Sequence, residues 1–257
     1  MKKFKLHIIA LAVVLVAELI GKHTFNIGIG TIVLLPMLFA LIIGVLTTPK
    51  FLNIAKEDEM KKAGRLISVT LMLLMAKYGT TIGPTIDTVI KSSPALILQE
   101  FGNLGTVFLG VPLGVLLGLK REVIGGAHSI SREPNVALIA EKYGLDSPEG
   151  EGVLGVYIVG TVFGTIFMGI IASILATSTP LHPLSLAMAS GVGSASMMTA
   201  SVGALVELFP EMADKITAFG AASNLLSGLD GVYMSVFLAI PLAEKLYSVF
   251  MRKKGRK

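Results

Sequence analysis

Apolar stretches of membrane-spanning length follow one another along nearly the whole chain. Hydrophobic residues make up 53% of the 257 residues and charged residues only 15%, whereas a soluble domain carries roughly a quarter charged residues. A stretch of about 20 apolar residues can cross the hydrocarbon core of a bilayer as a helix. The sequence therefore predicts an all-α fold, a polytopic membrane helix bundle that forms a single transmembrane domain over residues 1–257. The eight predicted spans cover about 5–21, 27–48, 64–89, 94–118, 123–141, 153–176, 184–206 and 216–240.

The positions of lysine and arginine indicate how these spans are oriented. Cytoplasmic segments of membrane proteins are enriched in both residues. With the N-terminus in the cytoplasm, the basic residues gather in segments that are then cytoplasmic, such as 50–65 and the tail from Arg252, while Glu149 and Glu207 fall in external loops. We therefore expect a multi-pass protein of the cell inner (cytoplasmic) membrane with both termini in the cytoplasm. This distribution accounts for the net charge of +5 without a nucleic-acid partner.

Several kinds of chemistry are absent from the sequence. There is no cysteine, which excludes disulfides, thiolate chemistry and Fe–S sites. Neither the ATP-binding P-loop pattern nor the zinc-binding His-Glu-x-x-His pattern occurs, and the Gly-x-Ser-x-Gly pattern of many hydrolases is missing too. We expect no cofactor and no enzymatic activity.

Segments rich in glycine and serine interrupt two of the predicted spans. One covers residues 125–135 (Gly-Gly-Ala-His-Ser-Ile-Ser-Arg-Glu-Pro-Asn) and the other residues 190–196 (Ser-Gly-Val-Gly-Ser-Ala-Ser). A similar phrase follows each, at 137–141 and 204–207, which indicates an internal repeat. A broken helix exposes peptide groups that lipid cannot satisfy, and a pair of such breaks is typical of a transporter's binding site. The predicted discontinuous helices lie at about 123–141 and 184–206.

Polar residues inside the predicted spans are the candidate site residues, because such residues are costly in lipid. Gln99, Glu100 and Asn103 share one helical face. In the last span, Asn224 and Asp230 lie about two turns apart. The predicted substrate-binding residues are Gln99, Asn103, His128, Ser129, Ser131, Arg132, Asn135, Ser194, Ser196 and Asn224, and the predicted ion-coupling residues are Glu100, Glu133 and Asp230.

Some of these residues admit a purely structural interpretation. Arg132 and Glu133 either form an ion pair that stabilises the first break, or Arg132 binds a carboxylate of the solute through its planar guanidinium. His128 is either a proton carrier or a hydrogen-bonded packing residue. The polar face that carries Glu100 either takes part in binding or joins neighbouring helices.

Two parts of the sequence resemble known families. Residues 95–105 (Ala-Leu-Ile-Leu-Gln-Glu-Phe-Gly-Asn-Leu-Gly) and 128–135 (His-Ser-Ile-Ser-Arg-Glu-Pro-Asn) resemble an uncharacterised prokaryotic membrane family, domain of unknown function 3100, and the likeness covers most of the chain from about residue 64 onward. Residues 186–193, with the serines that follow and Asn224, resemble more distantly the lysine-exporter-like branch of the bile acid, arsenite and riboflavin transporter superfamily. That resemblance implies a helical transporter whose broken helices cross near the membrane midplane, and it does not imply lysine. Members of the superfamily usually have more spans than the eight predicted here.

These features together predict a secondary transporter of a small polar or anionic solute, coupled to H⁺ or Na⁺. Its two broken helices would line the solute cavity, and Glu100 and Asp230 would bind the coupling ion. The alternatives are a passive channel or a structural membrane subunit and, less favoured, an intramembrane hydrolase that uses Ser129 or Ser194 with His128. The expected partners are membrane lipid, the solute, H⁺ or Na⁺, and a second copy of the chain in a homodimer.

Overall fold

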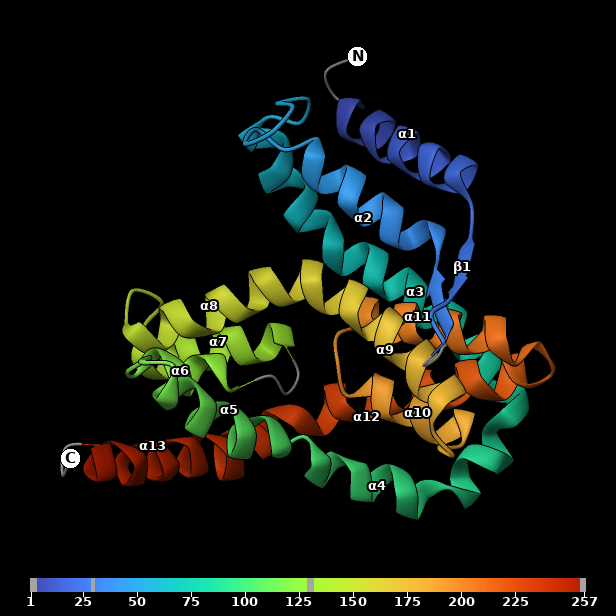
Figure 1. Cartoon of the computed structure of the whole chain (residues 1–257). Coiled ribbons are helices and arrows are strands. Elements are labelled where there is room, and N and C mark those ends of the chain that lie inside the picture. The colour runs from blue at the N-terminus through green and yellow to red at the C-terminus, as the bar shows by residue number, and fades with distance from the viewer. Residues whose placement is uncertain (1–3, 29–30, 129–131, 255–257) are drawn as a thin grey trace.

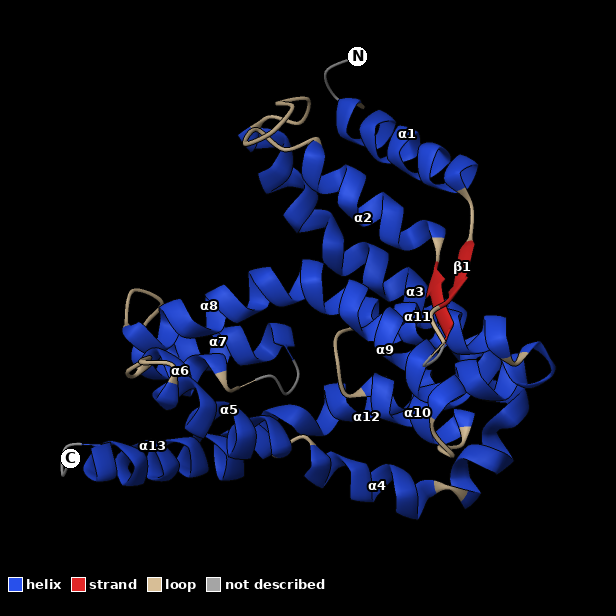
Figure 2. Cartoon of the chain, viewed as in Figure 1, coloured by secondary structure: helices blue, strands red, loops and turns tan. Residues whose placement is uncertain are grey.

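The chain folds almost entirely into helices. A computed structural model describes residues 4–28, 31–128 and 132–254, and Figures 1 and 2 show how the helices are arranged. Two π-helical turns (Gly160–Gly164 and Ser235–Ala239) join helices end to end, and a 3₁₀ turn (Pro210–Met212) leads into the helix that begins at Ala213. The α-helices are α1 (Lys5–Ile20), α2 (Pro36–Leu46), α3 (Glu57–Lys91), α4 (Ser93–Gly102), α5 (Gly105–Leu116), α6 (Glu122–Gly126), α7 (Arg132–Tyr143), α8 (Pro148–Val159), α9 (Thr165–Ser178), α10 (Pro183–Gly191), α11 (Ala195–Leu208), α12 (Ala213–Met234) and α13 (Ile240–Lys254).

A short β-hairpin replaces the start of the second predicted span. Strands β1 (His23–Asn26) and β2 (Thr31–Leu34) pair antiparallel, as the red arrows in Figure 2 show. The β-branched residues of β2 favour a strand. Pro36 then begins α2, since the first helical position needs no backbone N–H. The helix predicted from residue 27 is therefore wrong up to Pro36.

Three helices of the described chain are long and apolar enough to cross a membrane. They are Ser93–Leu116, Pro148–Ser178 and Pro210–Arg252. At about 1.5 Å per residue, Pro148–Ser178 alone measures roughly 46 Å, which exceeds the hydrocarbon core of about 30 Å. The helical fold and the membrane-like helices agree with the prediction. The count of eight spans is not confirmed.

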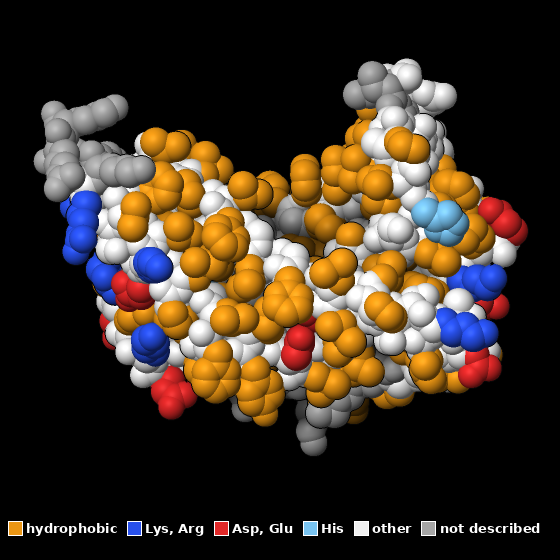
Figure 3. Space-filling model, turned by 90° about the horizontal axis from the view of Figure 1, so that it is seen from below, with side chains coloured by type: hydrophobic (Ala, Val, Ile, Leu, Met, Phe, Trp, Pro, Cys, Tyr) orange, Lys and Arg blue, Asp and Glu red, His pale blue; other side chains and the backbone are white. Residues whose placement is uncertain are grey.

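Hydrophobic and charged side chains separate on the surface. Figure 3 shows one face of the molecule, on which hydrophobic side chains cover the middle while most Lys, Arg, Asp and Glu side chains gather at the left and right margins. The long helices run between these margins in Figure 1. An apolar band between two charged ends is the distribution that a bilayer selects.

Two hydrophobic clusters lie at opposite ends of the bundle, and each packs several helices together. One joins α3, α9, α10, α11 and α12 and contains the buried residues Met198, Leu205 and Phe219. The other joins α5, α6 and α13 around Val111 and Ile124. The continuous helix from α12 to α13 belongs to both clusters, so it connects the two ends of the molecule.

Candidate functional site

Helices α6 and α7, the first predicted broken segment, form a hairpin. The side chain of Arg121, just before α6, pairs with Glu149 at the start of α8 and donates to Glu244 of α13 over 2.7 Å. Tyr143, at the end of α7, donates to the same Glu244 carboxylate over 2.9 Å. Because both ends of residues 122–143 meet Glu244, this segment enters and leaves the bundle at one end.

Charged and hydrogen-bonded groups hold the two ends of the α6–α7 hairpin together. The hydrogen bond to Glu244 raises the pKa of Arg121 above its usual value, and the bond to Glu149 acts in the same direction. Burial, followed by the bond to Glu244, raises the pKa of Tyr143. At neutral pH Arg121 therefore stays cationic and Tyr143 stays a hydrogen-bond donor.

The contact between α6 and α8 depends on two glycines. A Cβ atom at Gly125 would lie 1.9 Å from the backbone oxygen of Glu149, and one at Gly152 would lie 1.9 Å from the backbone oxygen of Glu122. Both distances are far inside van der Waals contact. The two helices therefore touch through their backbones.

Gly152→Ala is accordingly expected to destabilise the purified protein by about 2–3 kcal/mol, since overpacking against backbone cannot be relieved by a side-chain rotation. Gly155→Ala, in the same helix, is the matched control, because nothing lies within 4 Å of the added methyl group. Thermal unfolding in detergent measures both. Equal melting temperatures for the two variants would contradict the close approach of α6 and α8.

Helices α10 and α11, the second predicted broken segment, also form a hairpin. Along α10, Ser223 of α12 donates to Met188 O over 2.7 Å. Along α11, Ser201 donates to Met168 O of α9 over 3.0 Å and Thr165 of α9 donates to Ser196 over 3.1 Å. Helix α11 thus runs beside α9 in the same direction, and the short loops that join α9 to α10 and α11 to α12 lie at the same end.

The two hairpins open at opposite ends of the long helices. The α6–α7 hairpin opens at the start of α8 and in α13, whereas the α10–α11 hairpin opens at the end of α9 and the start of α12. The structure thus differs from the prediction of one crossing by each discontinuous helix over 123–141 and 184–206. The reason lies in contacts between distant residues: Arg121 and Tyr143 both meet Glu244 of α13, and α11 runs beside α9 in the same direction. Glu149, predicted in an external loop, lies at the end that holds Arg121.

A polar cluster around Glu100 fills the space between α4 and α12. Glu100 is 3% exposed. Its carboxylate accepts hydrogen bonds from Ser227 (2.8 and 3.0 Å), Asn103 Nδ2 (2.6 Å) and Gln99 Nε2 (3.2 Å). The Asp230 carboxyl group lies against that of Glu100. The structure therefore brings together three residues predicted on one face of α4 with one predicted on the last span.

The second hairpin is tied to this cluster. Gln99 Nε2 also donates to Ser223, which in turn donates to Met188 O of α10. On the adjacent face of α12, Asn224 Nδ2 donates to the carbonyl oxygens of Gly191 and Gly193, both over 2.9 Å. Asn224 thus binds the peptide groups that the break between α10 and α11 leaves free.

Predicted serines shape the same break. Ser194 precedes α11, and its hydroxyl accepts a hydrogen bond from Met197 N over 3.3 Å, a side-chain cap of the helix. The Ser194 and Ser196 hydroxyls lie 2.9 Å apart. Ser194 therefore caps α11 and contacts Ser196, and Ser196 also accepts a hydrogen bond from Thr165 of α9.

The first break places another set of polar atoms against α12. His128 is 2% exposed and lies against the backbone of Ser235. Asn135 Nδ2 donates to His128 O. Among the described residues, neither ring nitrogen of His128, nor Asn135 Oδ1, nor Ser235 Oγ completes a hydrogen bond. Ser129 and Ser131 lie outside the described residues, and for Arg132 and Glu133 the structure describes the backbone in α7 and not the side chains.

The sequence did not indicate three serines of α12 and of the π-helical turn that follows it. Ser223, Ser227 and Ser235 contact predicted site residues and were not among the candidates. Ser223, Ser227 and Asp230 recur at helical spacing, a polar stripe that identifies a contact face. Along the continuous helix from α12 to α13, Asn224 and Ser235 are separated by about 16 Å, and Asp230 lies between them.

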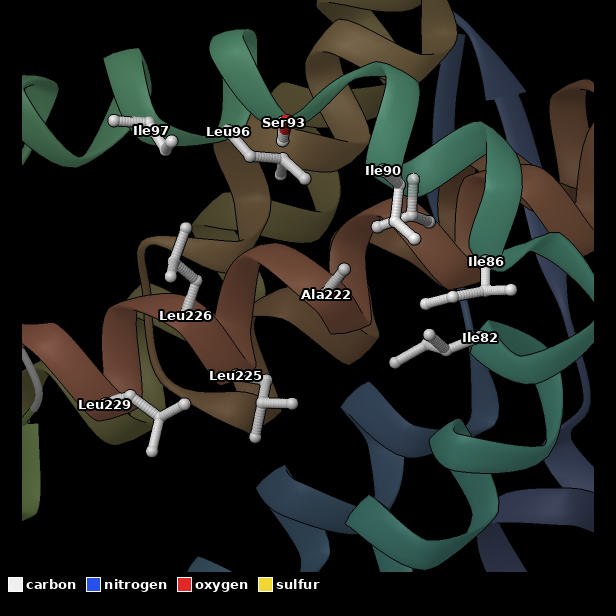
Figure 4. Close-up of a pocket in the computed structure, with 11 residues that line it drawn as sticks. Ile82, Ile86, Ile90, Ser93, Leu96, Ile97, Ala222, Leu225, Leu226 and Leu229 are labelled. Atoms are coloured by element: carbon white, nitrogen blue, oxygen red, sulfur yellow. The ribbon is translucent and has the colours of Figure 1, made fainter.

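The groove beside the cluster is apolar. It lies between α3, α4 and α12 and has a volume of about 380 Å³. Figure 4 shows side chains such as Ile82, Ile90 and Leu226 pointing into it, and apart from Ser93 its labelled residues are aliphatic. Such a surface suits an acyl chain of a lipid and offers a polar solute no partner. The described residues contain no group of three or more His, Asp and Glu placed to hold a metal.

Comparison with known proteins finds one family. The profile of a family described as "Protein of unknown function (DUF3100)" matches residues 15–249, which is nearly the whole chain. No curated protein and no solved structure matches the chain.

Proposed function

We propose that this chain, which belongs to the DUF3100 family, is a secondary transporter of a small polar or anionic solute. The observation that carries the proposal is the convergence of two hairpins, entering from opposite ends, on one polar stretch of α12. The break of each hairpin lies beside that stretch, at Ser235 and at Asn224. Hairpins of this kind hold free peptide groups inside a membrane bundle, where a solute can bind them.

The solute would bind between the two breaks. His128, Asn135 and Ser235 provide buried polar atoms without described partners, and the start of α11 provides N–H groups for an anion. Ser129, Ser131 and Arg132 stay predicted ligands of the solute. The two hairpins open at opposite ends of the bundle. Each could therefore give the solute access to the site from one side of the membrane in turn.

The Glu100 and Asp230 carboxyl groups would bind the coupling ion, H⁺ or Na⁺. Two adjacent carboxylates repel each other when both are ionised, so a proton or a cation stabilises the pair. Glu133 stays a third predicted ion-coupling residue. The apolar groove of Figure 4 would contact membrane lipid, and a homodimer stays a prediction.

The contacts favour six crossings and two re-entrant hairpins in the inner membrane. Helices α1, α2, α3, α4–α5, α8–α9 and α12–α13 would cross, with the α6–α7 hairpin on the cytoplasmic side. Lys5 of α1 pairs with Glu59 of α3 over 2.8 Å, which agrees with α1 and α2 forming one in-and-out pair. Six crossings leave both termini in the cytoplasm.

Transport into proteoliposomes tests the proposal. A thermal-shift screen of the purified protein against amino acids, sugar acids and dicarboxylates would first identify a solute, because a ligand of the folded state raises its apparent stability. Uptake of that solute should require an H⁺ or Na⁺ gradient and fall at least about tenfold in Glu100→Gln and Asp230→Asn, a loss of more than about 1.4 kcal/mol of coupling. Uptake without a gradient, unchanged in both variants, would instead identify a passive channel.

A further inference from the structure

Oxygen acceptors outnumber hydrogen-bond donors in the cluster around Glu100. Gln99 Oε1, Asn103 Oδ1 and Asp230 Oδ1 are buried, and none of the three has a hydrogen-bond partner among the described residues. Asn103 is only 1% exposed. The nearby donors bond to another group: the amide nitrogens of Gln99 and Asn103 and the Ser227 hydroxyl all donate to Glu100. Buried acceptors left in this way are costly.

A single proton does not satisfy these acceptors. Placed between the carboxyl groups of Glu100 and Asp230, it pairs one oxygen with another. The amide oxygens of Gln99 and Asn103 remain without partners. A metal cation differs, because several oxygen atoms bind it at once.

The side-chain amides of Gln99 and Asn103 can stabilise the cluster both with and without a bound cation. Rotation of a terminal amide by 180° exchanges its oxygen and nitrogen without changing its shape. In the present orientation Asn103 Nδ2 donates to Glu100 over 2.6 Å and Gln99 Nε2 over 3.2 Å, which stabilises a carboxylate that has no cation. After rotation both amide oxygens face the carboxyl groups and complete a shell of oxygen ligands.

The ligand types select a hard cation. Carboxylate, amide and hydroxyl oxygens suit alkali and alkaline-earth ions, and the cluster contains no imidazole or sulfur for a transition metal. Of these hard cations, Na⁺ is the one that the proposed ion-coupled transport would use. We infer that Gln99, Glu100, Asn103, Ser227 and Asp230 form a Na⁺ site, an inference that rests on the proposed function and names its coupling ion.

Thermal unfolding of the purified full chain tests the Na⁺ site without any solute. NaCl replaces choline chloride at constant ionic strength and pH, with KCl as a second series. Saturating Na⁺ should raise the melting temperature by about 5 °C, because it binds the folded state alone, and K⁺ should raise it less. Glu100→Gln should abolish the shift, and Asn103→Leu should raise the Na⁺ concentration needed by at least about tenfold by removing one ligand. If the variants at buried positions fail to fold, Asp230→Asn provides the same test, because Asp230 is only half-buried.

The matched control is Ser201→Ala. Ser201 is also buried, and it donates to Met168 O away from the cluster, so the variant should keep the full Na⁺ shift. A melting temperature that depends on pH and not on Na⁺ would make the cluster a proton site and overturn the inference. A shift produced by Ca²⁺ or Mg²⁺ alone, or one that persists in Glu100→Gln, would overturn it too. Solute uptake driven by protons alone would refute the Na⁺ site and leave the transporter proposal intact. A Na⁺-dependent melting temperature in a protein that transports no solute would support the Na⁺ site and refute the transporter proposal.

Discussion

Arg121→Ala is expected to lower the melting temperature of the purified protein by about 10 °C. Arg121 is itself 42% exposed, but it pairs with Glu149, whose side chain is only 5% exposed, and with the partly exposed Glu244. Removing one partner of such a pair leaves a buried charge uncompensated, which costs about 3–5 kcal/mol. In a chain of about this length each kcal/mol shifts the melting temperature by about 2–4 °C.

The ion pair at the other end of the molecule is the matched control. Lys22 pairs with Glu207 at the end of α11, but the two side chains are 46% and 36% exposed. Exposed pairs contribute about 0–1 kcal/mol, so Lys22→Ala should change the melting temperature by about 2 °C or less. The double variant Arg121→Ala, Glu149→Gln should recover part of the loss, since it removes the buried charge. Equal effects of Arg121→Ala and Lys22→Ala would show that Glu149 is not buried in a closed hairpin mouth.

The helices themselves could largely be predicted, because apolar stretches of membrane length leave the backbone few other choices. The segments 125–135 and 190–196 were predicted as breaks from glycine and serine in an apolar context, and α6 ends at Gly126 and α10 at Gly191 within them. The β-hairpin was not, because Thr31–Leu34 is apolar enough to resemble the start of a helix. Pro36 is the residue that marks the boundary.

The path of the two broken segments could not be predicted. Residues 183–208 have the length and composition of a single span, and a hairpin has the same composition. What distinguishes the two is a set of contacts between distant residues, such as Tyr143 with Glu244 and Ser201 with Met168. A single sequence does not show which distant residues contact each other. For the same reason the internal repeat stays a prediction: both similar phrases lie in the second helix of a hairpin, while the first helices differ in length.

Helical spacing predicted which site residues of one helix lie on the same face. It did not predict which residues of other helices contact them. It grouped Gln99, Glu100 and Asn103, which the structure also groups. It did not identify Ser223 or Ser227 as their partners, because small hydroxyl side chains are common on packing faces of membrane helices. Their role depends on the carboxylate that faces them from α4.

Asn224→Asp is expected to destabilise the α10–α11 hairpin by about 3–4 kcal/mol. Asn224 Nδ2 donates to Gly191 O and Gly193 O, and the substitution keeps the shape of the side chain while replacing this donor by an acceptor. Three oxygens then face one another in a partly buried place, with both hydrogen bonds lost and repulsion added. Thermal unfolding of the purified protein measures the effect, and the solute identified by the transport screen should bind the variant at least about tenfold more weakly, since each 1.4 kcal/mol of lost preorganisation is one decade.

Asn26→Asp is the control for this substitution. Asn26 is exposed, and its side-chain oxygen accepts from Gly28 N over 2.9 Å. Because a carboxylate oxygen also accepts, the melting temperature should stay within about 2 °C of the parent protein, as for most surface changes. Lowering the pH should restore part of the stability of Asn224→Asp and not alter the control, because only a protonated carboxyl group can donate to a glycine carbonyl. An Asn224→Asp protein as stable as the parent at neutral pH would show that the break between α10 and α11 is held by something other than this side chain.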